Sequence, residues 1–369
     1  MKRFWLMLAL MALAANFDLG ETARAQAEKG AQGGARPQQR SGPRNLAILI
    51  FDGVQIIDYT GPYETFGHVH VGDGHAFNIY TVSEKTSPIT TAMGMSVNPR
   101  YGFENAPEPD VLLVPGGDIR GALDNPALVR WVRDKAQRAE MVLSVCNGAF
   151  ILAKTGLLDG LEATTTANLI HLLREAAPKV KVVDDRRFVD NGKFITAAGL
   201  SSGIDGALHV VERLHGRGVA QAAALGMEYN WDPESKFVRA ALADKYMRFN
   251  YDVKVSEGGW KPLSRAGSQD AWENRWSVTT GSAAADVLAS VNNSIAAQRT
   301  YGGPPAVKWV RADSPSPKGA TRSLWRFTDE KGGAWDGSVS VEPVAGETNR
   351  FTLTVRVARS NASARLPSN

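Results

Sequence analysis

The chain contains a single cysteine among its 369 residues, so no disulfide can form within it. It has little net charge, because the formal +4 comes entirely from the first 44 residues and the remainder is about neutral. A neutral folded part lacks the basic footprint that phosphate backbones require, which excludes a nucleic-acid-binding function. Long apolar runs are missing too. The run near the N terminus has about 14 residues, fewer than the roughly 20 of a membrane-spanning helix.

That short run has the features of an export signal. Two basic residues precede it, and small residues reading ARAQA follow it, which is the pattern of a secretory signal peptide over residues 1–27. An uncleaved anchor is the alternative, but Asp18 and Glu21 follow too soon for a longer span. We expect cleavage near Ala27, a periplasmic or secreted protein, and no stable membrane insertion after cleavage.

Composition divides the rest of the chain. Residues 28–44 are rich in Gly, Pro, Gln and Arg and have no large apolar side chain, so we predict a flexible tether. An α/β domain is predicted over 45–225. A helical connector and linker are predicted over 226–269, with 261–269 as the linker itself. Residues 270–369 are predicted to form a small strand-rich domain of unassigned role.

In the first domain, short apolar runs alternate with amphipathic segments. Buried strands are predicted at 46–51, 77–83, 111–115 and 141–145, and helices at 61–71, 125–139, 148–156 and 202–216. This alternation predicts an α/β fold with a doubly wound, mostly parallel, flavodoxin-like sheet that carries helices on both faces.

The second part of the chain has a different pattern. One helix is predicted at 284–299, and strand-like runs follow it, which indicates an α+β or β-rich domain. Six tryptophans fall between residues 260 and 335. An aromatic platform for a ligand is one interpretation of them, but packing in a core is the one we favour.

The lone thiol occupies a notable position. Cys146 ends the predicted strand 141–145, and Asn147-Gly148 then opens a helix. Ligands bind at such strand ends in open α/β sheets, and the partial positive charge of a helix N terminus favours thiolate. A tight turn of this kind also projects a nucleophile outward. The alternative is a buried cysteine that acts as a small hydrophobe.

Two further segments supply partners for the thiol. The strand at 111–115 ends in Pro-Gly-Gly, and we expect the N–H of Gly117, next to Gly116, to form an oxyanion hole with the Asn147 amide. Asp58 lies among apolar neighbours, so we expect a raised pKa and a carboxyl that donates a proton to a substrate or a hydrogen bond to a thiolate. The alternative for Asp58 is the N-cap of the helix predicted from residue 61.

Metal binding finds little support. The stretch HVHVGDGH, residues 68–75, contains three histidines, but no cysteine or clustered acid completes a site. We therefore expect neither a metal ion nor any other cofactor.

Four motifs occur in order: FDGVQIIDYTGPYE (51–64), VLLVPGG (111–117), VCNGAFILAKTGLLDGLEATTT (145–166) and FITAAGLSSGIDGALHVVERL (194–214). Over residues 45–225 they resemble the ThiJ/PfpI family, which has a glutamine-amidotransferase-like α/β fold. The nearest branches are the isonitrile hydratases and the sensor domains of AraC-type regulators. The resemblance implies Cys146 as nucleophile and Asp58 as its acid partner. Members of the family commonly dimerise, so we expect a homodimer.

The chain departs from the family pattern at two positions. Hydratases carry Thr after the cysteine, and peptidase-like and glyoxalase-like members carry His, whereas this chain has Asn147, which we expect to orient water or the substrate nitrogen. Thr166 replaces the His of the usual A-T-T-H motif, and we place Thr165 and Thr166 at the substrate. The expected function is hydration of an isocyanide, a small-molecule substrate, to an N-substituted formamide. The alternative is a non-catalytic module that senses a ligand or redox state.

Overall fold

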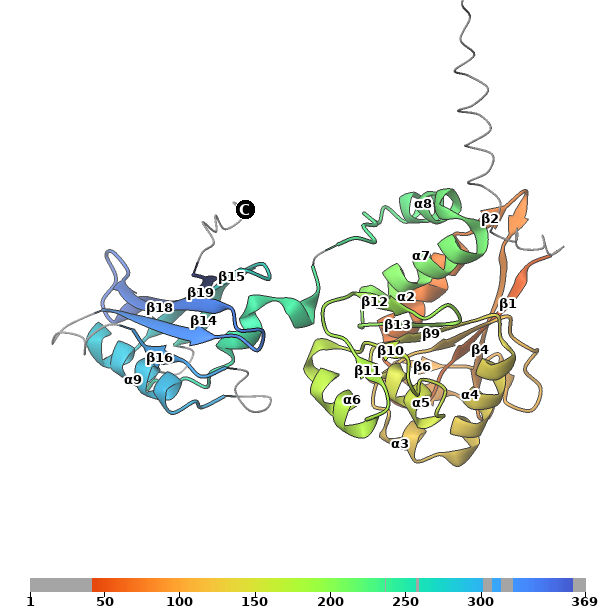
Figure 1. Cartoon of the computed structure of the whole chain (residues 1–369), viewed down its shortest axis with the longest axis horizontal. Coiled ribbons are helices and arrows are strands. Elements are labelled where there is room, and N and C mark those ends of the chain that lie inside the picture. The colour runs from red at the N-terminus through yellow and green to blue at the C-terminus, as the bar shows by residue number, and fades with distance from the viewer. Residues whose placement is uncertain (1–41, 236, 257–258, 301–306, 313–320, 361–369) are drawn as a thin grey trace, which may run out of the picture. The chain divides into compact units, whose positions relative to one another are not determined.

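The computed structural model describes residues 42–235, 237–256, 259–300, 307–312 and 321–360 (Figure 1). The predicted signal peptide and nearly all of the predicted tether lie outside these residues. Across the described ranges, no helix combines the length and the apolar character needed to cross a membrane.

The first domain is built on a seven-stranded sheet with the order β12-β13-β9-β8-β1-β4-β7. All neighbouring strands are parallel except β12 and β13, which are antiparallel. The strands are β1 (Arg44–Leu49), β4 (Phe77–Ser83), β7 (Tyr101–Gly102), β8 (Val111–Val114), β9 (Met141–Val145), β12 (Phe188–Asp190) and β13 (Phe194–Ala197). The four strands predicted from apolar runs are all present.

Helices cover both faces of this sheet, as predicted. Figure 1 shows α2, α7 and α8 on one side and α3, α4 and α5 on the other. The helices are α2 (Ile56–Gly67), α3 (Arg120–Leu123), α4 (Pro126–Arg138), α5 (Gly148–Lys154), η1 (Ala167–Leu169), α6 (Ile170–Ala176), α7 (Ser202–His215) and α8 (Arg217–Gly226). Three small strand pairs complete the domain: β2 (His70–Val71) with β3 (Gly74–His75), β5 (Ile89–Thr90) with β6 (Ser96–Val97), and β10 (Glu162–Ala163) with β11 (Lys181–Val182).

Helix α2 differs from its prediction. It begins at Ile56 rather than near Gly61 and ends at Gly67 rather than at Val71. The prediction placed Pro62 in the first turn, the usual position of proline in a helix, whereas it lies inside α2. Asp58 therefore lies within the first turn and is not the N-cap, so the capping interpretation is wrong.

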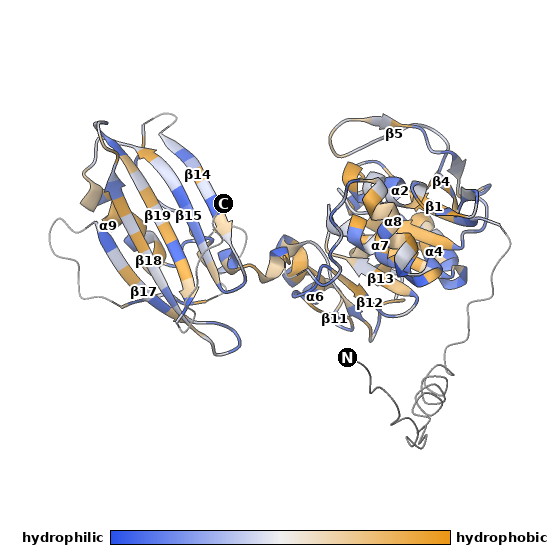
Figure 2. Cartoon of the chain, turned by 90° about the horizontal axis from the view of Figure 1, so that it is seen from above, coloured by the Kyte–Doolittle hydropathy of each residue, from blue (hydrophilic) through white to orange (hydrophobic). Residues whose placement is uncertain are grey.

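The C-terminal part forms a six-stranded sheet with the order β14-β15-β19-β18-β17-β16, antiparallel throughout. Buried and exposed residues alternate along β17 and β18, and Figure 2 shows the matching alternation of hydropathy. The helix α9 packs against β17 and β18. The elements are η2 (Arg239–Ala241), η3 (Ala243–Met247), β14 (Trp260–Gly267), β15 (Ala271–Thr279), α9 (Ala284–Ala296), β16 (Val310–Arg311), β17 (Arg322–Thr328), β18 (Ala334–Pro343) and β19 (Arg350–Arg359).

Two boundary predictions are corrected here. The predicted linker 261–269 is largely strand β14, an edge strand with no buried residue and no alternation of apolar and polar residues. The predicted helical connector contains the end of α8 and two short 3-10 helices, and the second of these packs on β15 and β19. Five tryptophans, at positions 272, 276, 309, 325 and 335, are buried in this core, which confirms the packing interpretation.

Candidate active site

Cys146 lies on the sharp turn between β9 and α5 with φ of 58°, a left-handed conformation that is uncommon for a residue with a side chain. Two bonds hold it there: its N–H donates to the Ala197 carbonyl at 3.1 Å, and the Thr165 hydroxyl donates to its carbonyl at 2.8 Å. Next along the chain, a Cβ at Gly148 would meet the Val114 carbonyl oxygen at 2.2 Å, so only glycine fits. The backbone is thus arranged as the predicted nucleophile turn.

Asp58 faces this turn from the first turn of α2 and is completely buried. Its Oδ1 accepts the Leu200 N–H at 3.1 Å, its Oδ2 accepts the Gly116 N–H at 3.2 Å, and the carboxyl is also hydrogen-bonded to the Cys146 thiol. Burial raises the pKa of Asp58 to about 6, against the lowering effect of these bonds. The structure therefore brings together the two residues that the motifs singled out.

The thiol is poorly ionised. Burial and the negative charge of Asp58 raise the pKa of Cys146 to about 12, while the Asn147 N–H and the Thr166 hydroxyl act in the opposite direction. At neutral pH the proton therefore resides on sulfur and Asp58 is a carboxylate. The raised pKa of Asp58 is as predicted, whereas the raised pKa of Cys146 is opposite to the expected thiolate. The physical reason is desolvation, which outweighs the field of a helix of only seven residues.

The Asn147 side chain forms two hydrogen bonds with the backbone of one residue, Gly117. Its Oδ1 accepts the Gly117 N–H at 2.8 Å, and its Nδ2 donates to the Gly117 carbonyl at 2.9 Å. The Gly117 N–H is therefore engaged and is not the oxyanion donor we expected, and the Gly116 N–H is engaged by Asp58. The Asn147 amide group holds the loop after β8 instead of orienting water or substrate.

The two threonines have different positions. Thr165 is fully buried and bonds the Cys146 carbonyl, so its predicted contact with substrate is wrong. Thr166 is half-buried and its hydroxyl bonds the sulfur. The Asn147 backbone N–H and the Thr166 hydroxyl are thus the hydrogen-bond donors at the thiol.

Two residues of the site were missed from sequence. A Cβ at Gly199 would lie 3.3 Å from the Cys146 sulfur, so this glycine, at φ of 143°, leaves room for the thiol. Its position just after β13 is the one available signal. Leu200, at φ of 50°, presents its N–H to Asp58, and nothing in a leucine marks such a role in a sequence.

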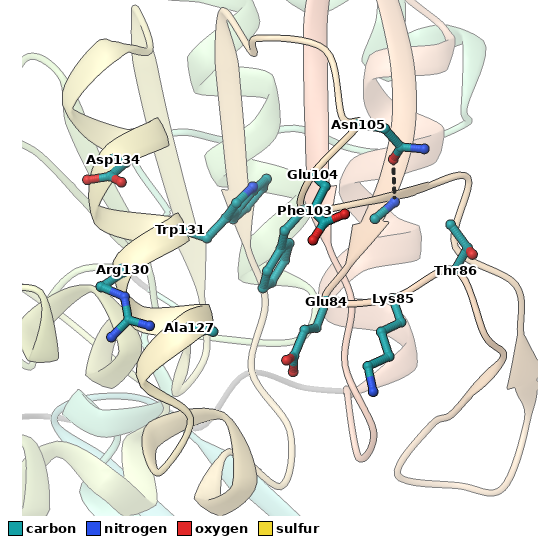
Figure 3. Close-up of a pocket in the computed structure, with 11 residues that line it drawn as sticks. Glu84, Lys85, Thr86, Phe103, Glu104, Asn105, Ala127, Arg130, Trp131 and Asp134 are labelled. Carbon is teal, nitrogen blue, oxygen red and sulfur yellow. Dashed lines mark hydrogen bonds between the residues drawn. The ribbon is translucent and has the colours of Figure 1, made fainter.

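Other features lie apart from this site. A cavity of about 650 Å³ is lined in part by Phe103 and Trp131, whose rings stack at 4.6 Å (Figure 3). None of the residues that line it belongs to the Cys146 site. In the described ranges no three His, Cys, Asp or Glu side chains form a group suited to a metal ion.

Comparisons with known proteins agree with the motifs. The model of the DJ-1/PfpI family matches residues 44–213. An isonitrile hydratase of Pseudomonas putida is 34% identical over 185 residues, which are 50% of this chain and 78% of that protein. The transcriptional regulator GbdR of Pseudomonas aeruginosa is 27% identical over 191 residues, 51% of each chain. The crystal structure of a ThiJ/PfpI family protein from Pseudomonas syringae matches with 28% identity and a TM-score of 0.47, covering 55% of this chain and 86% of that one.

Proposed function

Because this chain belongs to the DJ-1/PfpI family, we propose that its first domain hydrates isocyanides to N-substituted formamides with Cys146 as nucleophile. The observation that carries the proposal is the hydrogen bond between a strained, partly exposed thiol and the buried Asp58 carboxylate. The likeness to an isonitrile hydratase over most of that enzyme's length supports the same chemistry.

The first step is addition of the thiol to the terminal carbon of the isocyanide. Asp58 takes the proton from sulfur as the sulfur–carbon bond forms, and it then delivers this proton to the same carbon. The product is a thioimidate, in which that carbon carries hydrogen, sulfur and a double bond to nitrogen. A pKa of about 6 suits Asp58 to both roles near neutral pH.

The second step is hydrolysis of the thioimidate. The oxygen of a water molecule attacks the carbon while Asp58 takes a proton from that water. Asp58 then passes the proton to the nitrogen. The resulting intermediate collapses to a carbonyl, the carbon–sulfur bond breaks, and the hydroxyl proton returns to sulfur through Asp58. The sum is one isocyanide and one water giving one formamide. The Asn147 N–H and the Thr166 hydroxyl, which face the sulfur, stabilise negative charge there.

Product analysis tests this proposal. The purified protein is incubated with an alkyl and an aryl isocyanide, and formamide is measured by chromatography. The wild-type protein forms formamide catalytically, and Cys146→Ser and Asp58→Asn do so at least about 100-fold more slowly, because each lacks a group that takes part in bond formation. Equal formamide from wild type and Cys146→Ser contradicts the proposal.

A second candidate is a domain that binds a small molecule without turnover. Its support is the likeness to a transcriptional regulator and the engagement of Asn147 and Gly117 with each other, which leaves the site without the expected oxyanion donor. Calorimetry distinguishes the two. Saturable binding of an isocyanide with no formamide released favours the sensing module.

We also propose that the protein acts outside the cytoplasm. The support is the charged, apolar and small-residue pattern of the first 27 residues. Cell fractionation of a C-terminally tagged chain tests this. The processed form is expected in the periplasm or medium, and a full-length form in the cytoplasm contradicts it.

A further inference from the structure

Arg187 forms hydrogen bonds with both ends of the segment 198–201, which contains a donor to Asp58. Leu200, whose N–H bonds Asp58, lies in the segment between β13 and α7. At one end of the segment the Arg187 carbonyl accepts the Ala198 N–H at 2.8 Å. At the other end the Arg187 guanidinium donates to the Ser201 hydroxyl oxygen at 3.3 Å. Arg187 therefore bonds residues on both sides of Leu200, whose φ is 50°.

The guanidinium is itself held by a buried charge. Arg187 donates through Nε to Asp205, on α7, at 2.6 Å, and Asp205 is only 2% exposed. A buried carboxylate that loses its cation is strongly destabilised, so the pair keeps a fixed geometry. Arg187 thus links the loop rigidly to helix α7.

The connector after α8 closes over this pair. The Tyr229 hydroxyl donates to Asp205 at 3.0 Å, and the Phe237 carbonyl accepts from Arg187 at 3.1 Å. Burial and the charge of Asp205 raise the pKa of Tyr229 to about 12, so its hydroxyl remains a donor. Both residues follow the stretch 44–213 that the family model matches.

We propose that Arg187 and Asp205 are positioning residues that hold the Leu200 N–H on the Asp58 carboxylate, and that the connector, through Tyr229 and Phe237, is part of this device. The role in catalysis rests on the proposed function. The positioning itself does not, because it concerns Asp58 in the free protein. The connector after α8 would thus help to set the geometry of the Asp58–Cys146 pair.

The hydrogen bonds of Arg187 and Asp205 affect the pKa of Asp58 through Leu200. The Leu200 N–H stabilises the carboxylate and lowers the pKa of Asp58 against the effect of burial, and the titratable side chain that faces Asp58 is the Cys146 thiol. Loosening the loop weakens the Leu200 bond, so the pKa of Asp58 rises further. Less carboxylate is then present near neutral pH to accept the thiol proton.

Infrared titration of the full chain tests the proposal without any isocyanide. The carbonyl band of protonated Asp58 is identified by its loss in Asp58→Asn, and its midpoint is compared in wild type, Tyr229→Phe and Arg187→Lys. Tyr229→Phe removes the hydroxyl and keeps the ring. Arg187→Lys keeps the positive charge and removes the guanidinium with its several N–H donors. Matched controls are Tyr63→Phe and Arg186→Lys, since Arg186 pairs with Glu162 and Asp185 at the surface.

Both network variants are expected to raise the midpoint by about half a pH unit or more, and the controls to leave it unchanged. Alkylation of Cys146 by iodoacetamide at pH 6 is expected to slow about twofold in the same variants, because fewer carboxylates are available. An unchanged midpoint in both network variants overturns the proposal, even where their unfolding temperatures fall. Formamide formation is measured in a separate assay. The absence of formamide contradicts the proposed function and leaves the positioning role of Arg187 and Asp205 standing.

Discussion

The Cys146 thiol is hydrogen-bonded to the Asp58 carboxylate, and this contact raises the pKa of the thiol while it lowers that of the acid. Burial raises both. The result is a neutral thiol beside a carboxylate that titrates at about 6, which is an arrangement for general-base activation of the nucleophile rather than for a preformed thiolate.

Ionisation of the thiol gives the first prediction. Thiolate ultraviolet absorbance, taken as the difference between wild type and Cys146→Ser, is expected to stay absent well above the ordinary thiol pKa of about 8.5, because Cys146 titrates at about 12. In Asp58→Asn the thiolate is expected at lower pH, since the neighbouring negative charge is gone. Thiolate present at pH 7 in the wild type contradicts this description of the pair.

The stability of the protein should depend on pH through Asp58. The pKa of Asp58 is raised on folding from 3.8 to about 6, so the folded state binds the proton more tightly. The stabilisation is complete below pH 3.8 and is lost as pH rises through 6, about 3 kcal/mol in all. Urea unfolding at pH 4 and pH 7 measures it, with Asp58→Asn as the comparison that lacks this contribution. Equal pH dependence in both proteins contradicts the assignment.

Gly199 should be needed for the thiol and not only for the fold. Gly199→Ala places a Cβ 3.3 Å from the sulfur, whereas Gly160→Ala, at φ of 78°, meets nothing within 4 Å. Both substitutions are expected to cost about 1–3 kcal/mol of stability through backbone strain. Only Gly199→Ala is expected to change the iodoacetamide reactivity of Cys146, by about tenfold. Equal reactivity in the two variants contradicts the close packing at the thiol.

The Asn147–Gly117 pair should stabilise the loop after β8. Asn147→Ala removes both hydrogen bonds, and we expect a loss of about 1–3 kcal/mol in urea unfolding. Asn147→Thr, which introduces the residue of the hydratase branch, is expected to lose a similar amount but to free the Gly117 N–H for an oxyanion. A higher rate of formamide formation in Asn147→Thr than in the wild type, where the Gly117 N–H is engaged, checks this, and unchanged stability in both variants contradicts it.

The sequence was sufficient for the α/β domain because its central strands are buried, largely apolar runs, such as those at 111–115 and 141–145, which are strands β8 and β9. It failed for β14, an edge strand with no buried residue and no alternation of apolar and polar residues. Helix α2 was displaced because Pro62 is usual in a first turn but lies deeper in this helix.

The sequence predicted the pairing of Cys146 with Asp58 and the raised pKa of Asp58, but not the raised pKa of Cys146. The family resemblance implied that Asp58 is the acid partner of Cys146, and the structure brings these two side chains into contact. The Leu200 and Gly116 N–H groups lower the pKa of Asp58, and burial raises the pKa of both Asp58 and Cys146. Both effects come from the packing of segments far apart in the chain. The desolvation of Cys146 has no local signature, which is why the sequence pattern favoured a thiolate.

Intact-mass spectrometry of the wild-type protein, quenched in acid shortly after mixing with an isocyanide, shows whether Cys146 forms a covalent intermediate. We expect a transient mass increase equal to one isocyanide, located on Cys146 by proteolysis, absent from Cys146→Ser, and decaying as formamide appears. Formamide formed at the same rate by Cys146→Ser, with no adduct on the wild type at any time, contradicts it.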